Sequence, residues 1–194
     1  ATFLEDIMTY AREGKERYGL KSHFPSLDRI LTGFHPGRLY ILAARPSVGK
    51  SAFAGNVAMN VGYKGSGVML FTLEMSREEL ITRWLSNLTE IDVNSIQLAK
   101  LDMHQQQALA TAATKLSALP LYVEDNSALR MPELRARVRR HMRLHPETRL
   151  LIVDYLQLIQ GPASSENRQQ GISQISRPLK GLAKELSVPA AVPW

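Results

Sequence analysis

The stretch from Leu39 to Ser51 constrains the fold of this 194-residue chain more than any other part of it. It opens with the apolar run Leu39–Ala43, typical of a buried strand, and closes with Gly49-Lys50-Ser51. From Phe53 to Val61 an apolar residue then recurs every four positions, as on one face of a helix. A strand, a short loop and a helix in this order are the context of a phosphate-binding loop, or P-loop.

Such a loop binds phosphates through backbone N–H groups at the start of a helix, where the helix dipole adds partial positive charge. Lys50 is predicted to reach the β- and γ-phosphates, and the Ser51 hydroxyl to bind Mg²⁺. The consensus motif begins with glycine where this chain has Ala44, which is a departure. A chance Gly-Lys-Ser at a helix start is the alternative. The predicted nucleotide-binding residues are Ala44, Arg45, Pro46, Ser47, Val48, Gly49, Lys50 and Ser51.

Two further predicted strands end in a carboxylate. Val68–Leu73 is followed by Glu74, and Leu150–Val153 is followed by Asp154. Ligands of parallel α/β sheets bind at the carboxyl ends of the strands, so these groups should lie near the loop. Asp154 is predicted to hold Mg²⁺ and Glu74 to act as a general base. Each carboxylate alone could be a solvated group or a partner for a helix dipole, but the three features together favour a nucleotide site.

Predicted strands alternate with helices along the chain, which indicates an α/β fold with a mostly parallel sheet and helices on both faces. Residues 188–192 could begin a fifth strand. Pro178 and Gly181 are expected to interrupt the helix before it. Residues 89–103 show no clear hydrophobic periodicity, so the sequence predicts only a polar connection of undefined structure there.

An amphipathic helix is predicted over residues 3–17, ahead of the α/β region. Its apolar face needs a partner, either its own domain or a neighbouring subunit. The predicted organisation is a linker helix over residues 1–19 and one α/β domain over residues 20–194.

The composition is that of an ordinary globular chain, with 44% hydrophobic and 22% charged residues. The absence of cysteine excludes disulfides and thiolate metal sites. No apolar run is long enough to predict a membrane span. The net charge of +6 permits nucleic-acid binding without showing it.

Two basic features on the predicted helix before residue 146 have simple interpretations. The arginine-rich run 135–143 is interpreted as a solvated helix face, with a DNA or partner surface as the alternative. His141 and His145 have a spacing that can suit a metal, but no third ligand is in view, so no metal is expected there.

Three segments together resemble the ATPase core of the DnaB family of replicative hexameric helicases. They are Ala44–Ser51, Thr72-Leu-Glu-Met-Ser76 and Leu151–Leu158, and the resemblance covers about residues 20–190. It implies a RecA-like P-loop NTPase fold, ATP and Mg²⁺ as cofactors, a hexameric ring and translocation on single-stranded DNA. It also implies a cytoplasmic role in bacterial or phage replication, with a primase and a helicase loader as partners.

By position, Lys50 and Ser51 match the family's phosphate and Mg²⁺ residues, Glu74 its catalytic glutamate and Asp154 its Walker B aspartate. The segment 3–17 lies where the family has a linker helix that packs on the adjacent subunit.

The resemblance also exposes departures. Members of the family continue beyond the fifth strand with a polar sensor, DNA-binding loops and an arginine finger, so the domain is expected to be C-terminally incomplete. Residues 190–194 do not match the strand expected there. The chain alone is therefore expected to bind ATP but to hydrolyse it weakly. A RecA-type recombinase ATPase and a non-hydrolysing ATP-binding assembly or loading module stay open as alternatives.

Overall fold

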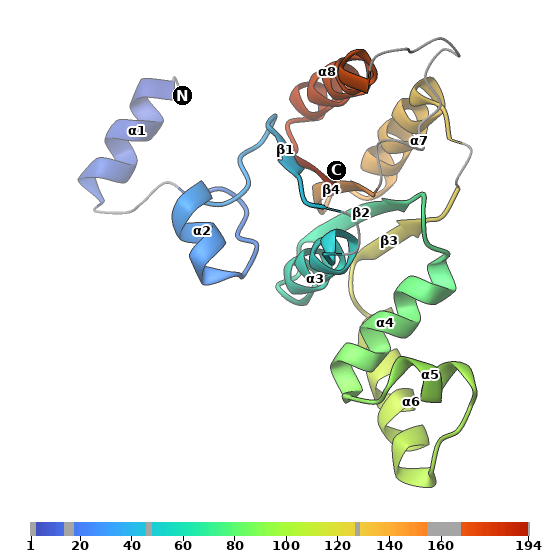
Figure 1. Cartoon of the computed structure of the whole chain (residues 1–194). Coiled ribbons are helices and arrows are strands. Elements are labelled where there is room, and N and C mark those ends of the chain that lie inside the picture. Colours follow the sequence, from blue (N-terminus) through green and yellow to red (C-terminus); the bar gives the residue numbers. More distant parts are fainter. Residues whose placement is uncertain (1–2, 14–17, 46–47, 127–128, 155–167, 194) are drawn as a thin grey trace.

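The computed structural model describes residues 3–13, 18–45, 48–126, 129–154 and 168–193. At its centre lies a five-stranded sheet with the strand order β1-β5-β4-β2-β3 (Figure 1). All four strand pairs are parallel, so every strand ends at the same edge. The predicted α/β fold with a parallel sheet is confirmed. The strands are β1 (Leu39–Leu42), β2 (Gly67–Thr72), β3 (Leu121–Glu124), β4 (Thr148–Asp154) and β5 (Ala190–Pro193).

Helices join the strands and cover both faces of the sheet, as predicted. The connection from β2 to β3 is the longest and carries three helices that extend to one side of the sheet (Figure 1). The helices are α1 (Phe3–Arg12), α2 (Pro25–Leu31), α3 (Lys50–Tyr63), α4 (Arg77–Thr89), α5 (Val93–Gln97), α6 (Met103–Ser117), α7 (Met131–Leu144) and α8 (Arg168–Leu186).

The alternation of side chains along β2 divides the core into two layers. Val68 and Leu70 pack with α3 and α4 on one face, whereas Met69 and Phe71 pack with α7 and α8 on the other. All six residues of β2 are buried. A strand covered on both faces reads as a continuous apolar run, which is why the sequence identified β2 and β4 so directly.

Local sequence signals account for the ends of several helices. Ser76 and Glu79 form a capping box at the start of α4, and Asp102 and Gln105 form a second one at α6. The segment left undefined by the sequence contains α5, whose first turn is capped by the Asp92 carboxylate.

The prediction that Pro178 and Gly181 interrupt the last helix is wrong. α8 continues through Pro178, because Leu179, Leu182 and Ala183 are fully buried and hold the turn that follows it. The fifth strand that residues 188–192 could begin is present as β5, which lies inside the sheet between β1 and β4. Pro193 is compatible with an inner strand because it is the last residue of β5, where a missing N–H disturbs the ladder least.

The amphipathic helix predicted at the N-terminus is present as α1, described as far as Arg12. Leu4, Ile7 and Met8 on α1 are 63%, 40% and 52% exposed, and the helix stands clear of the sheet (Figure 1). These apolar side chains are therefore not buried against the rest of the described chain. No helix in the described residues is long and apolar enough to cross a membrane.

Candidate nucleotide-binding site

The loop after β1 leads directly into α3, which begins at Lys50. Gly49 precedes it with φ of 95°, a left-handed conformation that glycine adopts without strain. The first N–H groups of a helix have no partner within it, so the start of α3 suits an anion. Pro46 and Ser47 lie outside the described residues, so their predicted contacts stay predictions.

Lys50 reaches back across the loop that precedes it. Its Nζ donates a hydrogen bond of 3.3 Å to the carbonyl oxygen of Ala44, the residue at the consensus glycine position. Ala44 has no positive φ, so the backbone there does not require glycine. The departure from the consensus therefore puts no strain on the backbone at Ala44. Ala44, Arg45 and Val48 are all exposed.

Asp154, the last residue of β4, is 5% exposed and lies against the start of α3. Burial raises the pKa of its carboxyl group above the usual value, and the negative charge of Glu74 adds to that effect. A hydrogen bond with Ser51 and the positive charge of Lys50 act in the opposite direction. The carboxylate thus interacts with all three of the other predicted catalytic or metal-binding residues.

Glu74 is an exposed residue in the turn between β2 and α4. Thr72, two residues earlier, pairs with Asp154 in the sheet register, and the N–H of Leu73 donates to the Asp154 carbonyl oxygen at 2.5 Å. The predicted base therefore follows the strand that lies beside Asp154. The sequence placed both carboxylates at one sheet edge, and the structure confirms that arrangement.

The oxygen atoms near Asp154 fit a hard divalent cation. Its Oδ1 is buried and accepts no hydrogen bond within the described residues, and the Ser51 hydroxyl lies close enough to lower the pKa of the carboxyl group. The described residues contain no cluster of three or more histidine, cysteine, aspartate or glutamate side chains that could hold a metal. Mg²⁺ suits such a sparse protein donor set because it retains waters and binds phosphate oxygens.

The arginine-rich face of α7 is largely paired within the chain. Arg137 bonds Glu124 at 2.6 Å, and Arg139 bonds Glu185 on α8 with both nitrogens, at 2.7 and 2.9 Å. His141 and His145 stack on each other, and both rings lie against Tyr122. Arg137, Arg139, Arg140 and Arg143 are all exposed, which fits the interpretation of this run as a solvated helix face.

Sequence reasoning missed the residues that hold the turn around Glu74. Thr72 donates from its hydroxyl to the Met75 carbonyl oxygen at 2.8 Å. Asp125 accepts from the backbone N–H of Arg77 at 3.1 Å. The sequence showed Asp125 only as part of a polar segment after a strand, and nothing local indicated which helix it would meet.

The parallel sheet, the lysine at the start of α3 and the acidic ends of β2 and β4 define a nucleotide-binding ATPase domain of the RecA-like P-loop class. The chain belongs to the family described as the DnaB-like helicase C terminal domain, whose model matches residues 19–192.

Curated relatives of the chain are bacterial replicative DNA helicases. Replicative DNA helicase DnaB of Geobacillus stearothermophilus is 42% identical over 184 residues, which are 94% of this chain and 40% of that protein. DnaB of Helicobacter pylori strain J99 is 38% identical, over 96% of this chain and 39% of that protein. Replicative DNA helicase DnaC of Bacillus subtilis is 42% identical, over 88% and 38%. The chain thus spans about two fifths of the length of these relatives.

Solved structures agree with this assignment. One solved ATPase domain superposes with a TM-score of 0.87 at 30% identity, covering all of this chain and 70% of that one. A DnaB-like replicative helicase, described with its interactions with primase, superposes with a TM-score of 0.84 at 30% identity, covering all of this chain and 48% of that one. The RecA-like fold implied by the sequence resemblance is confirmed.

Proposed function

We propose that this chain is the motor domain of a replicative DNA helicase, which hydrolyses ATP to translocate on single-stranded DNA and unwind duplex at the replication fork. The observation that carries the proposal is the buried Asp154 carboxylate at the end of β4, beside the end of β2 that leads to Glu74 and close enough to Ser51 and Lys50 for both to act on its pKa. Membership of the helicase family favours this function over a RecA-type recombinase.

Each residue of the site has a distinct part in the proposed hydrolysis. The N–H groups at the start of α3 and the Lys50 ammonium bind the phosphates of ATP and offset the charge that develops on them. Glu74, exposed beside the loop, orients the attacking water and accepts its proton. Ser51 and Asp154 hold Mg²⁺, which neutralises phosphate charge when bound.

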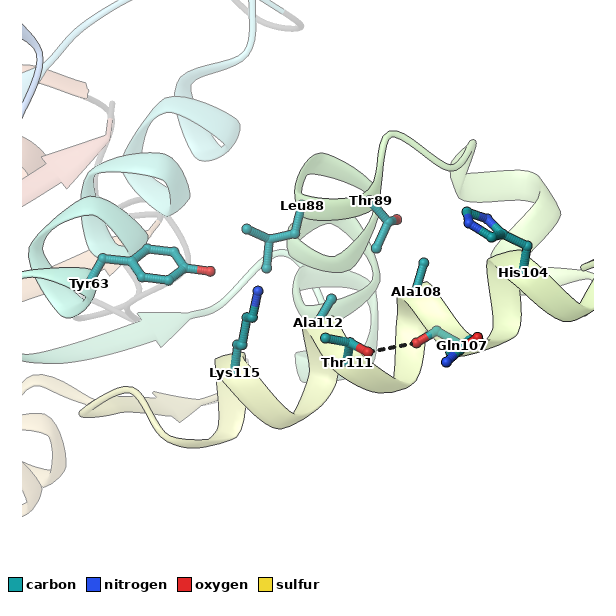
Figure 2. Close-up of a pocket in the computed structure, with 9 residues that line it drawn as sticks. All are labelled: Tyr63, Leu88, Thr89, His104, Gln107, Ala108, Thr111, Ala112 and Lys115. Carbon is teal, nitrogen blue, oxygen red and sulfur yellow. Dashed lines mark hydrogen bonds between the residues drawn. The ribbon is translucent and has the colours of Figure 1, made fainter.

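The assembly of subunits is proposed to depend on α1. Its exposed side chains Leu4, Ile7 and Met8 form an apolar face, and the linker segment 1–19 would carry that face to the next subunit of a homo-hexamer. A groove of about 660 Å³ between α4 and α6 offers a surface of suitable chemistry (Figure 2). The lining residues that contact a docked helix would be Tyr63, Leu88, Ala108, Ala112 and Lys115.

Further partners follow from the relatives. Single-stranded DNA is the substrate along which a helicase motor translocates, and the net charge of +6 suits binding to its phosphates. A primase is supported by the neighbouring helicase structure described with one. A helicase loader is proposed on the family resemblance alone.

Unwinding of a forked DNA duplex tests the proposal, with ATP and Mg²⁺ and the intact protein that contains these residues. Lys50→Ala should abolish both unwinding and ATP hydrolysis. Lys184→Ala is the matched control, because Lys184 is an exposed lysine in the last turn of α8, and it should unwind like the wild type. Unwinding that survives in Lys50→Ala would refute the proposed motor.

A non-hydrolysing assembly or loading module is the alternative from another class. It predicts nucleotide-dependent binding to a helicase without turnover in the intact protein. The interaction of Asp154 with both Lys50 and Glu74 argues against it, because a module that does not hydrolyse ATP has no chemical need for all three.

A further inference from the structure

Glu74 itself is exposed, but the residues on either side of it are fixed. Thr72, 2% exposed, donates from Oγ1 to the Met75 carbonyl oxygen at 2.8 Å, which bridges the turn from one side of Glu74 to the other. Leu73 is buried and its N–H donates to the Asp154 carbonyl oxygen. The backbone of Glu74 thus lies in a turn that is hydrogen-bonded on both sides. Its exposed side chain can still change its rotamer.

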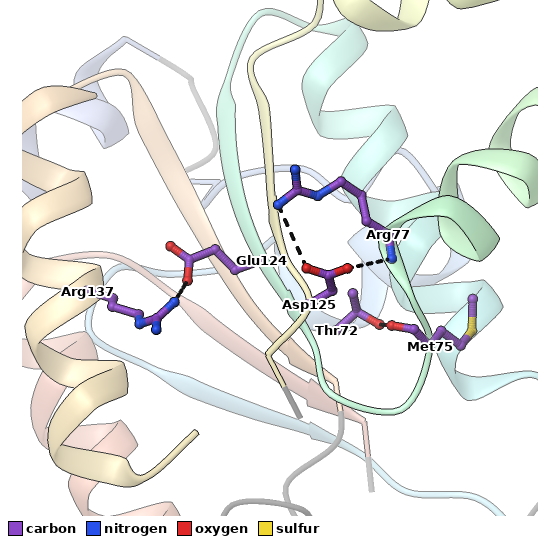
Figure 3. A network of polar contacts seen from close by, with 6 residues as sticks. All are labelled: Thr72, Met75, Arg77, Glu124, Asp125 and Arg137. Carbon is purple, nitrogen blue, oxygen red and sulfur yellow. Dashed lines mark hydrogen bonds and ion pairs between the residues drawn. The ribbon is translucent and has the colours of Figure 1, made fainter. Parts of the chain in front are cut away.

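The far end of the turn is tied to a different strand. The Arg77 N–H, at the first residue of α4, donates to Asp125 Oδ2 at 3.1 Å, and the Arg77 guanidinium lies 3.8 Å from Oδ1 (Figure 3). The Ser76–Glu79 capping box satisfies other N–H groups of this helix end. Asp125 therefore fixes the start of α4 relative to the carboxyl end of β3.

The residue before Asp125 is bonded in another direction. Glu124 meets Arg137 on α7 at 2.6 Å, whereas Asp125 meets Arg77 on α4 (Figure 3). Two adjacent carboxylates at one strand end thus serve two different helices. Removing one contact leaves the other in place, which makes Glu124 a matched control for Asp125.

We propose that Asp125 and Thr72 are positioning residues for the catalytic Glu74: together they hold the turn between β2 and α4 so that the Glu74 carboxylate faces Ser51 and Asp154. This inference rests on the proposed function, because it requires Glu74 to act in ATP hydrolysis. Neither residue touches the nucleotide in this scheme, and each acts through the backbone of the turn. A misplacement of about 1 Å in a catalytic group can lower a rate by roughly 100-fold.

Steady-state ATP hydrolysis by the intact protein, with nucleotide binding measured separately using a fluorescent ADP and Mg²⁺, tests the proposal. Asp125→Ala and Thr72→Val should each lower kcat by about 10- to 100-fold and leave the dissociation constant of the nucleotide unchanged. Asp125→Asn should restore most of the rate, since its amide oxygen still accepts from the Arg77 N–H. Thr72→Ser should do the same through its hydroxyl. Glu124→Gln should hydrolyse ATP like the wild type.

Combination with Glu74→Gln separates positioning from a structural effect. If Asp125 acts through Glu74, then Asp125→Ala should have no further effect on the residual single-turnover rate of Glu74→Gln. An additional loss in the double variant, or an equal loss in Glu124→Gln, would overturn the proposal. Wild-type turnover in Asp125→Ala or in Thr72→Val would also overturn it. Thr72→Val keeps the shape of the buried side chain, so it remains a test if Asp125→Ala does not fold.

The proposed function and the positioning role can be refuted separately. Glu74→Gln that hydrolyses ATP like the wild type would remove the assigned base, and the positioning role with it. Glu74→Gln that is inactive, beside an Asp125→Ala variant that is fully active, would leave the proposed function standing and refute the positioning role alone.

Discussion

Ser51 in the first turn of α3 lies close enough to Asp154 at the end of β4 for its hydroxyl to favour the ionised carboxylate, which couples the start of α3 to the centre of the sheet. One carboxylate oxygen of Asp154, Oδ1, is buried and accepts no hydrogen bond in the described residues. A buried carboxylate with an unmet oxygen destabilises the fold unless a cation or a proton is added. The buried Asp154 carboxylate therefore lowers the stability of the cation-free fold and should favour the binding of a cation.

Asp154→Asn should make the protein more stable than the wild type when no divalent cation is present. Added Mg²⁺ should then no longer raise the stability of the variant. The amide keeps an acceptor for the Ser51 hydroxyl but removes the buried charge. In EDTA the melting temperature should rise by about 2–4 °C for each kcal/mol relieved. Thermal unfolding with and without Mg²⁺ and ADP checks this, with Asp102→Asn, an exposed helix cap, as the control. A lower melting temperature of Asp154→Asn in EDTA would contradict the argument.

Gly67→Ala should destabilise the sheet by about 1–3 kcal/mol, because overpacking against rigid atoms forces backbone shifts. A Cβ at Gly67, the first residue of β2, would lie 2.8 Å from Thr148 Cα and 2.9 Å from Thr148 N, both backbone atoms of β4. Denaturant unfolding at equilibrium measures the change.

Gly181→Ala is the matched control for the same substitution. Apart from the backbone of its own helix, a Cβ at Gly181, on the exposed side of α8, would meet no atom of the described residues within 4 Å. It should stabilise the protein by about 0.5–1 kcal/mol, since alanine is the better helix former. Equal effects of the two glycine substitutions would show that local propensity, and not the close approach of β2 and β4, decides the outcome.

The sequence predicted those parts of the site that depend on local order along the chain. Lys50 and Ser51 follow a strand and open a helix, and Glu74 and Asp154 each follow a buried apolar run. Since parallel strands end at one edge, these local patterns were enough to bring the four residues together.

Contacts between distant segments could not be predicted in the same way. Asp125 and Arg77 are 48 positions apart, and their bond depends on β3 lying at the edge of the sheet beside β2. No local sequence pattern predicts the strand order. Likewise Pro178 disfavours a helix locally, but the buried side chains that follow it outweigh that preference. Tertiary packing thus decided the cases in which local propensity gave the wrong prediction.

The stability of the protein should fall as pH drops below about 6.5, in part through His141. Partial burial lowers the pKa of His141, and the positive charge of His145 lowers it further, against the opposing charges of Glu147 and Glu124. Because the folded pKa lies below the unfolded value of about 6.5, the unfolded chain takes up a proton that the folded chain refuses. The loss begins near pH 6.5 and ends at the folded pKa.

His141→Gln should flatten this pH dependence, since glutamine does not titrate and can still bond the Thr148 hydroxyl, which His141 Nε2 contacts at 2.9 Å. Unfolding free energies measured between about pH 5 and 8 test it, the slope falling by up to about one proton. His104→Gln, on the exposed face of α6, is the control and should keep the wild-type slope. An unchanged slope in His141→Gln would refute the assignment.

Replacing the apolar face of α1 should prevent assembly without unfolding the domain. Leu4→Ser with Ile7→Ser removes two exposed side chains, so the melting temperature of the isolated domain should change little. In the intact protein the hexamer should dissociate, because burial of that face against a neighbour is lost. Ile30→Ser, which replaces a 75% exposed isoleucine on α2, is the control and should assemble normally. Sedimentation with Mg²⁺ and nucleotide measures the outcome, and an intact ring in the double variant would exclude α1 as the assembly element.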